Sequence, residues 1–193
     1  MRASFEGVRR KILACKKCAT MNSGQKRVPG RGVSTPLVFF VGEAPGRLGA
    51  DKTGVPFTLD RSGKLLEDMM KMIQLSTRCN TYISNIVKCN PRSERGTNRR
   101  PSRSEIENCR EHLLAEIAAV RPRVLVTLGE LASSQLLECR HAMRDLNGKV
   151  CKSKSHGLVI PLYHPGYVIR GNYSIARYQR DFKQLRRLIE KKH

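Results

Sequence analysis

Apolar residues gather in four short runs along the chain, which alternate with segments of helical periodicity. Runs of this length, rich in β-branched and aromatic residues, are typical of buried strands. Strands that alternate with helices favour a parallel sheet covered on both faces. The pattern predicts an α/β fold, a single three-layer α/β/α domain with a mainly parallel four-stranded sheet. The expected strands are 37–42, 82–87, 123–128 and 158–163.

Helices are expected between and after these strands. Residues 62–74 carry an apolar face of Leu65, Leu66, Met69, Met70 and Ile73, with Ser62 near the start. Ser102 and Glu105 have the spacing of a capping box, and a helical face of Ile106, Cys109, Leu113, Ile117 and Val120 follows. A short helix is expected across Leu131 to Leu137. The last helix, about 174–191, is expected to turn inward Ile175, Tyr178, Phe182, Leu185 and Ile189.

The length of 193 residues fits one domain, so we expect residues 1–193 to fold as a unit. The start of the chain lacks the apolar core of a signal peptide, and no apolar stretch approaches the ~20 residues of a membrane span. We therefore expect an intracellular protein, in the cytoplasm or nucleoid, with no membrane partner.

The charge of the chain points to a polyanionic partner. Lys and Arg number 37 against 16 Asp and Glu, a formal net charge of +21. Nucleic acid is the first candidate for such a basic protein. Aromatic residues make up only 5% of the chain, with no Trp, so any base stacking must depend on one or two placed rings.

Seven cysteines in a chain without a secretory signal argue against a disulfide scaffold. Cys15 and Cys18 form a C-x-x-C pair, Cys89 follows the second strand, and Cys109 lies early in a helix. Four thiolates that converge can hold a structural zinc ion or a [4Fe-4S] cluster, and spacing does not separate the two. The other cysteines, Cys79, Cys139 and Cys151, fit buried free thiols.

The first strand runs into Gly42-Glu43-Ala44-Pro45-Gly46, which delivers a carboxylate to a strand end. Ligands of open parallel sheets bind outside the carboxyl ends of the strands. On this segment alone, a solvated turn and a functional site are equally good interpretations. The loop 91–100, with its several arginines, likewise fits a solvated turn or an edge that contacts phosphate.

Taken in order, the motifs resemble the iron-sulfur members of the uracil-DNA glycosylase superfamily, families four and five, over nearly the whole chain. Besides Cys15-x-x-Cys18 and the segment 42–46, known as motif A, they are Thr53-Gly54-Val55-Pro56-Phe57, Tyr82-Ile83-Ser84-Asn85-Ile86-Val87-Lys88-Cys89, Cys109 with Leu113, and His164-Pro165-Gly166-Tyr167-Val168-Ile169-Arg170, known as motif B.

The resemblance implies a DNA repair enzyme that hydrolyses the N-glycosidic bond of a flipped damaged base. It implies that Cys15, Cys18, Cys89 and Cys109 hold a structural [4Fe-4S] cluster, two of them from the N-terminal segment 1–36. It also assigns the base-contacting residues. Phe57 stacks on the base, Asn85 reads its polar edge, His164 bonds its carbonyl, and Gly42 and Ala44 lie against it.

By the same resemblance, Glu43 is the catalytic residue that handles the attacking water, with His164 as its partner on the leaving base. Tyr167, Ile169 and Arg170, together with Val168, form the wedge and phosphate clamp that contact the DNA. This assignment agrees with the physical chemistry of base extrusion and of charge development in the transition state. We see no positioned lysine nucleophile, which favours a monofunctional enzyme, and we expect a monomer.

The loop after motif A departs from the family four pattern. It reads Arg47-Leu48-Gly49-Ala50-Asp51-Lys52-Thr53-Gly54, is longer by one residue and keeps only Asp51 of the usual acids. Its length, and the stretch 57–63, look more like family five, whose members accept more lesions. Uracil is the expected base, and hypoxanthine or an alkylated purine is the alternative. Two further hypotheses are a non-catalytic nucleic-acid-binding module held by zinc and an RNA-directed enzyme on the same fold.

Overall fold

A computed structural model describes residues 4–18, 24–139 and 141–191. Its centre is one sheet with the strand order β1-β3-β2-β4-β6-β5. The four inner strands are parallel to one another, and the two outer strands pair antiparallel. The strands are β1 (Arg31–Gly32), β2 (Val38–Gly42), β3 (Thr81–Asn85), β4 (Val124–Leu128), β5 (Cys151–Ser153) and β6 (Gly157–Leu162).

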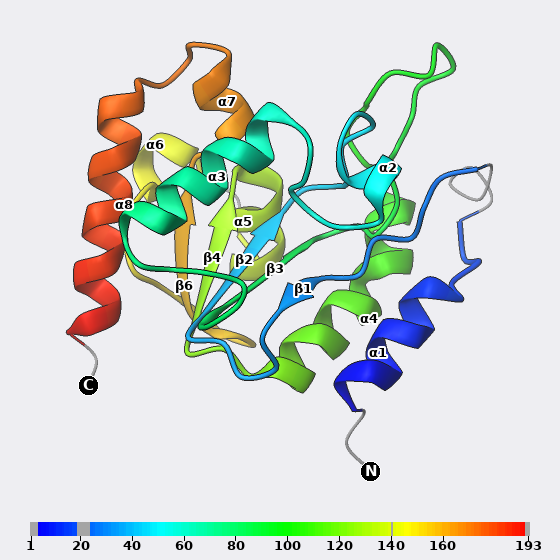
Figure 1. Ribbon diagram of the computed structural model, residues 1–193, viewed down its shortest axis with the longest axis horizontal. Coiled ribbons are helices and arrows are strands. Elements are labelled where there is room, and N and C mark those ends of the chain that lie inside the picture. Colours follow the sequence, from blue (N-terminus) through cyan, green and yellow to red (C-terminus); the bar gives the residue numbers. More distant parts are fainter. Residues whose placement is uncertain (1–3, 19–23, 140, 192–193) are drawn as a thin grey trace.

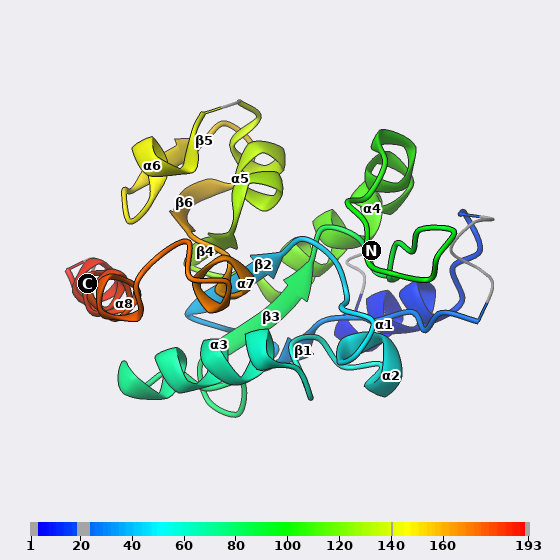
Figure 2. The same cartoon turned by 90° about the horizontal axis from the view of Figure 1, so that it is seen from above.

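Eight helices connect and flank these strands in the described part of the chain. They are α1 (Phe5–Leu13), α2 (Ala50–Thr53), α3 (Arg61–Met72), α4 (Arg103–Val120), α5 (Glu130–Leu137), α6 (Met143–Leu146), α7 (Pro165–Ile169) and α8 (Ile175–Glu190). Figure 1 shows the sheet in the middle of the molecule, with α3 and α8 on one side and α4 and α1 on the other. Seen from above in Figure 2, these helices form the two outer layers.

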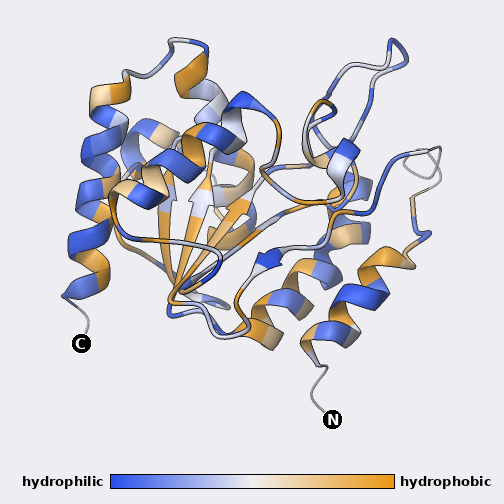
Figure 3. Cartoon of the chain, viewed as in Figure 1, coloured by the Kyte–Doolittle hydropathy of each residue, from blue (hydrophilic) through white to orange (hydrophobic). Residues whose placement is uncertain are grey.

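Two apolar cores fill the spaces between the layers. One packs α3, α7 and α8 against the sheet and includes Phe40, Leu66 and Phe182. The other packs α4 and α5 against the opposite face and includes Phe39, Leu113 and Leu136. Every residue of β2, β3 and β4 is buried, as expected for strands covered on both faces. In Figure 3 the inner strands are largely apolar, whereas the outer helices carry both apolar and polar residues.

The predicted three-layer parallel fold is confirmed, and the structure adds two strands to the expected four. Both β1 and β5 are edge strands of three residues or fewer, too short to show alternation in the sequence. The prediction for Ile175 was wrong, because this residue is 47% exposed at the start of α8, whereas Tyr178, Phe182, Leu185 and Ile189 are buried. Ile175 is the first residue of α8, directly after the N-cap Ser174, and the buried face of the helix begins only at Tyr178.

The capping box of α4 is present as predicted. The Ser102 side chain accepts a hydrogen bond from the Glu105 backbone N–H, and the Glu105 carboxylate accepts one from the Ser102 N–H. The helix expected at 62–74 begins at Arg61, since Asp60 rather than Ser62 caps it. Within the described residues, no helix is long and apolar enough to cross a membrane.

The register of the sheet brings the carboxyl ends of the four parallel strands to the same edge. Gly42, the last residue of β2, pairs with Asn85, the last residue of β3, and Leu128 of β4 pairs with Leu162 of β6. Parallel strands place their carboxyl ends together, at the end of the sheet near α2 and α7 in Figure 1. The segments that follow these four strands therefore share one side of the molecule.

Candidate active site

A cavity of about 760 Å³ opens at the carboxyl ends of the parallel strands. Each of the four strands leads into its lining, through Glu43 after β2, Asn85 at the end of β3, Gly129 after β4 and His164 after β6. Phe57, from the loop before α3, completes this group. The structure thus brings together five positions from distant parts of the chain, as expected at the carboxyl edge of an open sheet.

Asn85 carries an unsatisfied acceptor. The residue is 1% exposed, and its side-chain Oδ1 has no hydrogen-bond partner. A Cβ added to Gly42 would lie 2.5 Å from this oxygen and 2.7 Å from Cζ of Phe57. Gly42 therefore keeps open a narrow space between the Asn85 amide and the Phe57 ring. A buried acceptor without a partner costs free energy, so this space suits a ligand that supplies an N–H.

The Phe57 ring is held by an unusual backbone. Phe57 has a φ of +53° and Leu59 a φ of +60°, a left-handed conformation that non-glycine residues rarely adopt. Arg31 donates hydrogen bonds to the carbonyls of Pro56 at 3.1 Å and Phe57 at 3.4 Å. A Cβ at Gly63 would lie 2.5 Å from the Phe57 carbonyl, so only glycine fits there. These contacts fix the Phe57 ring at the boundary between the apolar core and the cavity, which it lines.

His164 faces the Phe57 ring, with ring centroids 5.9 Å apart. Its Nδ1 accepts a hydrogen bond from the Gly166 N–H at 3.0 Å, so the proton of the neutral ring lies on Nε2. The imidazole is enclosed by its neighbours, although part of the residue's surface opens to the cavity. Burial first, and then the charge of Arg170, lowers the pKa of His164 to about 4. At neutral pH His164 is therefore an uncharged hydrogen-bond donor.

Glu43 supplies a carboxylate to the same cavity. Burial raises its pKa above the usual range, Arg100 opposes this shift, and Glu130 adds to it. Arg100 also forms an ion pair of 3.6 Å with Glu130, which lines the cavity. A carboxylate with a raised pKa, partly withdrawn from water, is a good acceptor for a proton from water.

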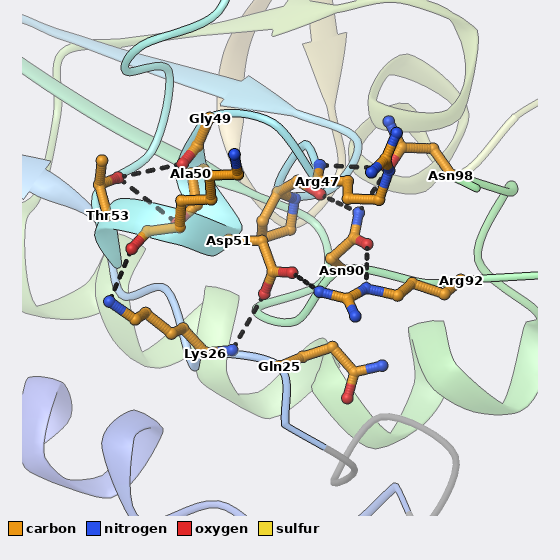
Figure 4. Close-up of polar contacts among 12 residues, drawn as sticks. Gln25, Lys26, Arg47, Gly49, Ala50, Asp51, Thr53, Asn90, Arg92 and Asn98 are labelled. Carbon is orange, nitrogen blue, oxygen red and sulfur yellow. Dashed lines mark hydrogen bonds and ion pairs between the residues drawn. The ribbon is translucent and has the colours of Figure 1, made fainter. Parts of the chain in front are cut away.

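The loop after motif A is anchored by Asp51, which the sequence singled out as its remaining acid. Asp51 is 6% exposed, accepts a hydrogen bond from the Lys26 N–H at 3.0 Å and pairs with Arg92. Figure 4 shows this network, in which Asn90 and Asn98 also take part. Asn90 Nδ2 donates to the Pro45 carbonyl at 2.6 Å and to Asn98 Oδ1 at 2.9 Å.

These bonds join the loop 91–100 and the preceding Asn90 to motif A and to the loop after it. Asn90, Asn98 and Arg99 line the cavity. The arginine-rich loop is thus part of the site's surroundings and more than a solvated turn.

Motif B forms the short helix α7 on the other side of the cavity. Tyr167 and Arg170 line the cavity and are exposed. Ile169 is half-buried and is not among the cavity-lining residues in the described part of the chain. Val168 is buried in the apolar core, so it lies outside the exposed surface expected for a wedge.

The four cysteines predicted as metal ligands converge. Burial is the main cause that raises the pKa of Cys89 to about 12 and that of Cys109 to about 11. The nearby thiols of Cys15 and Cys18 raise both pKa values further. The Lys88 N–H donates to Cys109 Sγ at 3.1 Å, and Asn108 Nδ2 lies 3.6 Å from Cys18 Sγ. Such donors stabilise thiolates, so the residues fit a group that binds four of them.

Among the described residues, no group of three or more His, Cys, Asp or Glu side chains is arranged to hold a metal ion. The remaining cysteines are free thiols as predicted, but Cys79 is exposed, and Cys139 and Cys151 are half-buried.

A buried ion pair lies between the cysteine group and Asn85. Lys88 Nζ contacts Glu116 Oε2 at 2.6 Å and donates to Ser84 Oγ and the Asn85 carbonyl, both at 2.7 Å. Both charged side chains are 2% exposed or less. All three protons of the ammonium group therefore have an acceptor, which a buried charge requires. The motif that contains Lys88 was recognised in the sequence, but this role of its side chain was not.

Sequence reasoning missed Arg31, a half-buried residue that only the folded chain brings to the site. It pointed to the corner Leu128-Gly129-Glu130 and to the loop that contains Arg100, but it did not predict the effect of Arg100 and Glu130 on Glu43. No signal in the sequence would have identified Arg31, whereas the Gly129-Glu130 corner after a strand does mark a position near the site.

A parallel α/β/α fold that gathers an aromatic ring, an amide, a histidine and a carboxylate around one cavity is an arrangement that suits an enzyme with a flat polar ligand. Comparison with known proteins identifies the family. A family model described as "Uracil DNA glycosylase superfamily" matches residues 29–189. The chain belongs to this superfamily.

The chain is 36% identical to the Type-4 uracil-DNA glycosylase of Archaeoglobus fulgidus, over 98% of the chain and 95% of that protein. It is 34% identical to the Type-4 uracil-DNA glycosylase of Sulfurisphaera tokodaii, over 96% of the chain and 84% of that protein. A Type-5 uracil-DNA glycosylase of Pyrobaculum aerophilum shares 36% identity over 58% of the chain and 52% of that protein. Similarity to these two Type-4 proteins thus extends over nearly the whole chain, and similarity to the Type-5 protein over part of it.

Proposed function

We propose that this protein is a DNA repair glycosylase that extrudes uracil from DNA into the cavity and hydrolyses its N-glycosidic bond. The observation that carries the proposal is the unsatisfied Oδ1 of Asn85, buried beside the Phe57 ring. Uracil presents an N3–H donor next to the O4 acceptor, which matches the acceptor and donor of an amide. Cytosine presents the opposite pattern and would leave the buried oxygen unpaired.

The chemistry follows from the positions of Glu43 and His164. Water held by Glu43 attacks the sugar C1′ and gives a proton to the carboxylate. The C1′–N bond breaks, and its electron pair leaves with the base. The Nε2–H of His164 donates to the base carbonyl on which negative charge grows, while the Glu43 carboxylate stabilises the positive character of the sugar. The released base then takes up a proton.

We infer that the enzyme is monofunctional. No lysine lines the cavity in the described part of the chain, and the nearby Lys88 is bonded to Glu116, Ser84 and the Asn85 carbonyl. An amine that is buried, bonded in this way and absent from the cavity lining is not placed to form a Schiff base with the sugar. We further propose that the protein acts as a monomer, on DNA inside the cell.

We also propose that Cys15, Cys18, Cys89 and Cys109 hold a [4Fe-4S] cluster. Four thiolates are the ligand set that such a cluster requires. The support from the structure is that Cys15 and Cys18 lie close enough to Cys89 and to Cys109 to raise the pKa of both thiols. When bound, the cluster would tie the segment after α1 to the end of β3 and to α4. Brown protein with iron and sulfide supports this proposal, and a colourless zinc protein contradicts it.

The experiment that tests the function is base release from matched oligonucleotides that carry uracil, hypoxanthine, xanthine or a methylated purine. We expect free uracil to be released fastest, from single- or double-stranded DNA, with the strand left intact at an abasic site. Faster release of a purine would transfer the assignment to the alternative substrate. Release of no base would favour a non-catalytic nucleic-acid-binding module, and stronger competition by RNA than by duplex DNA would favour an RNA-directed enzyme.

A further inference from the structure

Three of the five tyrosines form a ladder on the motif B side of the cavity. The ring of Tyr163 lies 5.1 Å from that of Tyr167, with an angle of 11° between their planes, so the two rings are stacked. Tyr173 packs against Tyr163 on a centroid distance of 4.5 Å, at an angle of 39°. We call Tyr173, Tyr163 and Tyr167 the tyrosine ladder. It concentrates the scarce aromatic residues of the chain at one place.

The inner end of the ladder is fixed to the fold. Asn147 Oδ1 accepts a hydrogen bond from the Tyr163 N–H at 3.0 Å, and Asn147 Nδ2 lies 3.5 Å from the Tyr173 hydroxyl. The same Nδ2 donates to Asp181 at 3.0 Å, which ties the ladder to α8. Tyr163 and Tyr173 also pack against the apolar core. The rings are therefore preorganised, and ordering them costs little when a ligand binds.

The outer end of the ladder is open. Tyr167 is 37% exposed, and it lines the same cavity as Asn85 and Phe57. Arg144 and Arg170 line this cavity as well and are exposed, so the open ring lies among positive charges. The volume of about 760 Å³ extends from the Asn85 end to the ladder, more space than one extruded base requires.

We propose that the tyrosine ladder is a second base-binding subsite, on which the base next to the extruded one on the same DNA strand stacks against Tyr167. This inference rests on the proposed function, since it takes the strand from the extruded nucleotide as its starting point. A stacked aromatic ring with guanidinium groups beside it suits an unpaired base and its phosphates, and such stacking accepts any base.

A stacking platform and a wedge require different side chains at position 167. A wedge fills the gap left by the extruded nucleotide and needs only apolar bulk, which leucine supplies. A stacking platform needs an aromatic face, which phenylalanine retains and leucine lacks. Substitution of Tyr167 by Phe or Leu therefore separates the two roles at one position.

The test is a double-mutant cycle between protein and DNA. The probe is an oligonucleotide with 2′-fluoro-deoxyuridine, which resists cleavage, and with either a normal base or a baseless tetrahydrofuran at one neighbouring position. Dissociation constants are measured for wild type, Tyr167→Phe and Tyr167→Leu. Met72→Ala is the control, because Met72 is also 37% exposed and is not a cavity-lining residue. Wild-type release of uracil, measured in parallel, tests the proposed function separately.

We expect Tyr167→Leu to weaken binding about 5- to 150-fold when the neighbouring base is present, and to have little effect when it is absent. Tyr167→Phe and Met72→Ala should bind like wild type. Equal losses for Tyr167→Leu with and without the neighbouring base would overturn the proposal and leave Tyr167 as a wedge. Coupling only to the base opposite the uracil, on the other strand, would also overturn it. If wild type binds and couples but releases no uracil, the proposed function fails while the subsite stands.

Discussion

At the scale of single residues, the site depends on groups that the fold leaves in an unusual state. Asn85 has a buried acceptor without a partner, His164 is held neutral, and the pKa of Glu43 is raised. Each of these states costs stability and suits a ligand or a reaction step. The three residues were predicted from their motifs, whereas their protonation states depend on burial that only the folded chain reveals.

The pH dependence of base release should report on Glu43. Catalysis needs the ionised carboxylate, so the rate should fall as the pH drops through the pKa of Glu43, above the range of an ordinary glutamate. Since Glu130 contributes to the raised pKa, Glu130→Gln should move the acid limb of the single-turnover rate to lower pH. Glu94→Gln, which removes the same charge from an exposed position of the loop 91–100, is the control. An acid limb that stays in place in Glu130→Gln would contradict this electrostatic account.

At the scale of helices and strands, the features that the sequence predicts best are those that depend on residues close together in the chain. The capping box of α4 needs only Ser102 and Glu105 three residues apart, and it forms as expected. The edge strands β1 and β5 depend on pairing with distant strands and leave no periodic signal. The helix α1 was also not predicted, although Ser4 caps it and Val8 and Ile12, four residues apart, form the buried face that packs near α4. The left-handed turn at Phe57 depends on Arg31 and Gly63 and was likewise invisible in the sequence.

The start of α4 provides a test of stability. Arg99 bonds both carboxylate oxygens of Glu105, at 2.7 and 2.5 Å, and lowers the pKa of Glu105 to about 2. The stabilisation is full above the unfolded pKa of about 4.3 and is lost as the pH falls toward 2. Glu105→Gln should therefore lower the free energy of unfolding by about 1–2 kcal/mol at pH 7. Urea unfolding should show a smaller difference at pH 3.

Glu107→Gln, an exposed substitution on the same helix, should leave the free energy of unfolding nearly unchanged at both pH values. A difference between wild type and Glu105→Gln that is as large at pH 3 as at pH 7 would show that the ion pair with Arg99 is not its origin.

At the scale of the whole molecule, the charge of +21 should govern binding to undamaged DNA. If the protein contacts four or more phosphates, raising the salt concentration from 50 to 200 mM should weaken its binding about 100-fold, because each contact releases counterions. Arg170→Gln should make this salt dependence shallower, since Arg170 is an exposed cation at the cavity. Fluorescence anisotropy with undamaged duplex measures both slopes. If the affinity of wild type for DNA did not change with salt concentration, electrostatic binding to the phosphate backbone would be contradicted.

The cysteine group should stabilise the fold without taking part in the reaction. Cys15→Ala removes a thiol from the segment after α1, so the cluster should be lost and the melting temperature should fall. Base release at low temperature should persist, since every reacting group lies in the cavity. Cys79→Ala, at an exposed free thiol, is the matched control. An unchanged melting temperature and iron content in Cys15→Ala would exclude Cys15 as a ligand.

The most direct test of the account is single-turnover release of uracil by wild type and by Asn85→Ala. We predict that wild type releases free uracil and no cytosine. Asn85→Ala should be slower by at least about 100-fold, since it loses the buried amide that pairs with uracil. It should still bind abasic DNA as wild type does. No release of uracil by wild type, or an equal rate in Asn85→Ala, would contradict the central claim that this amide selects the base.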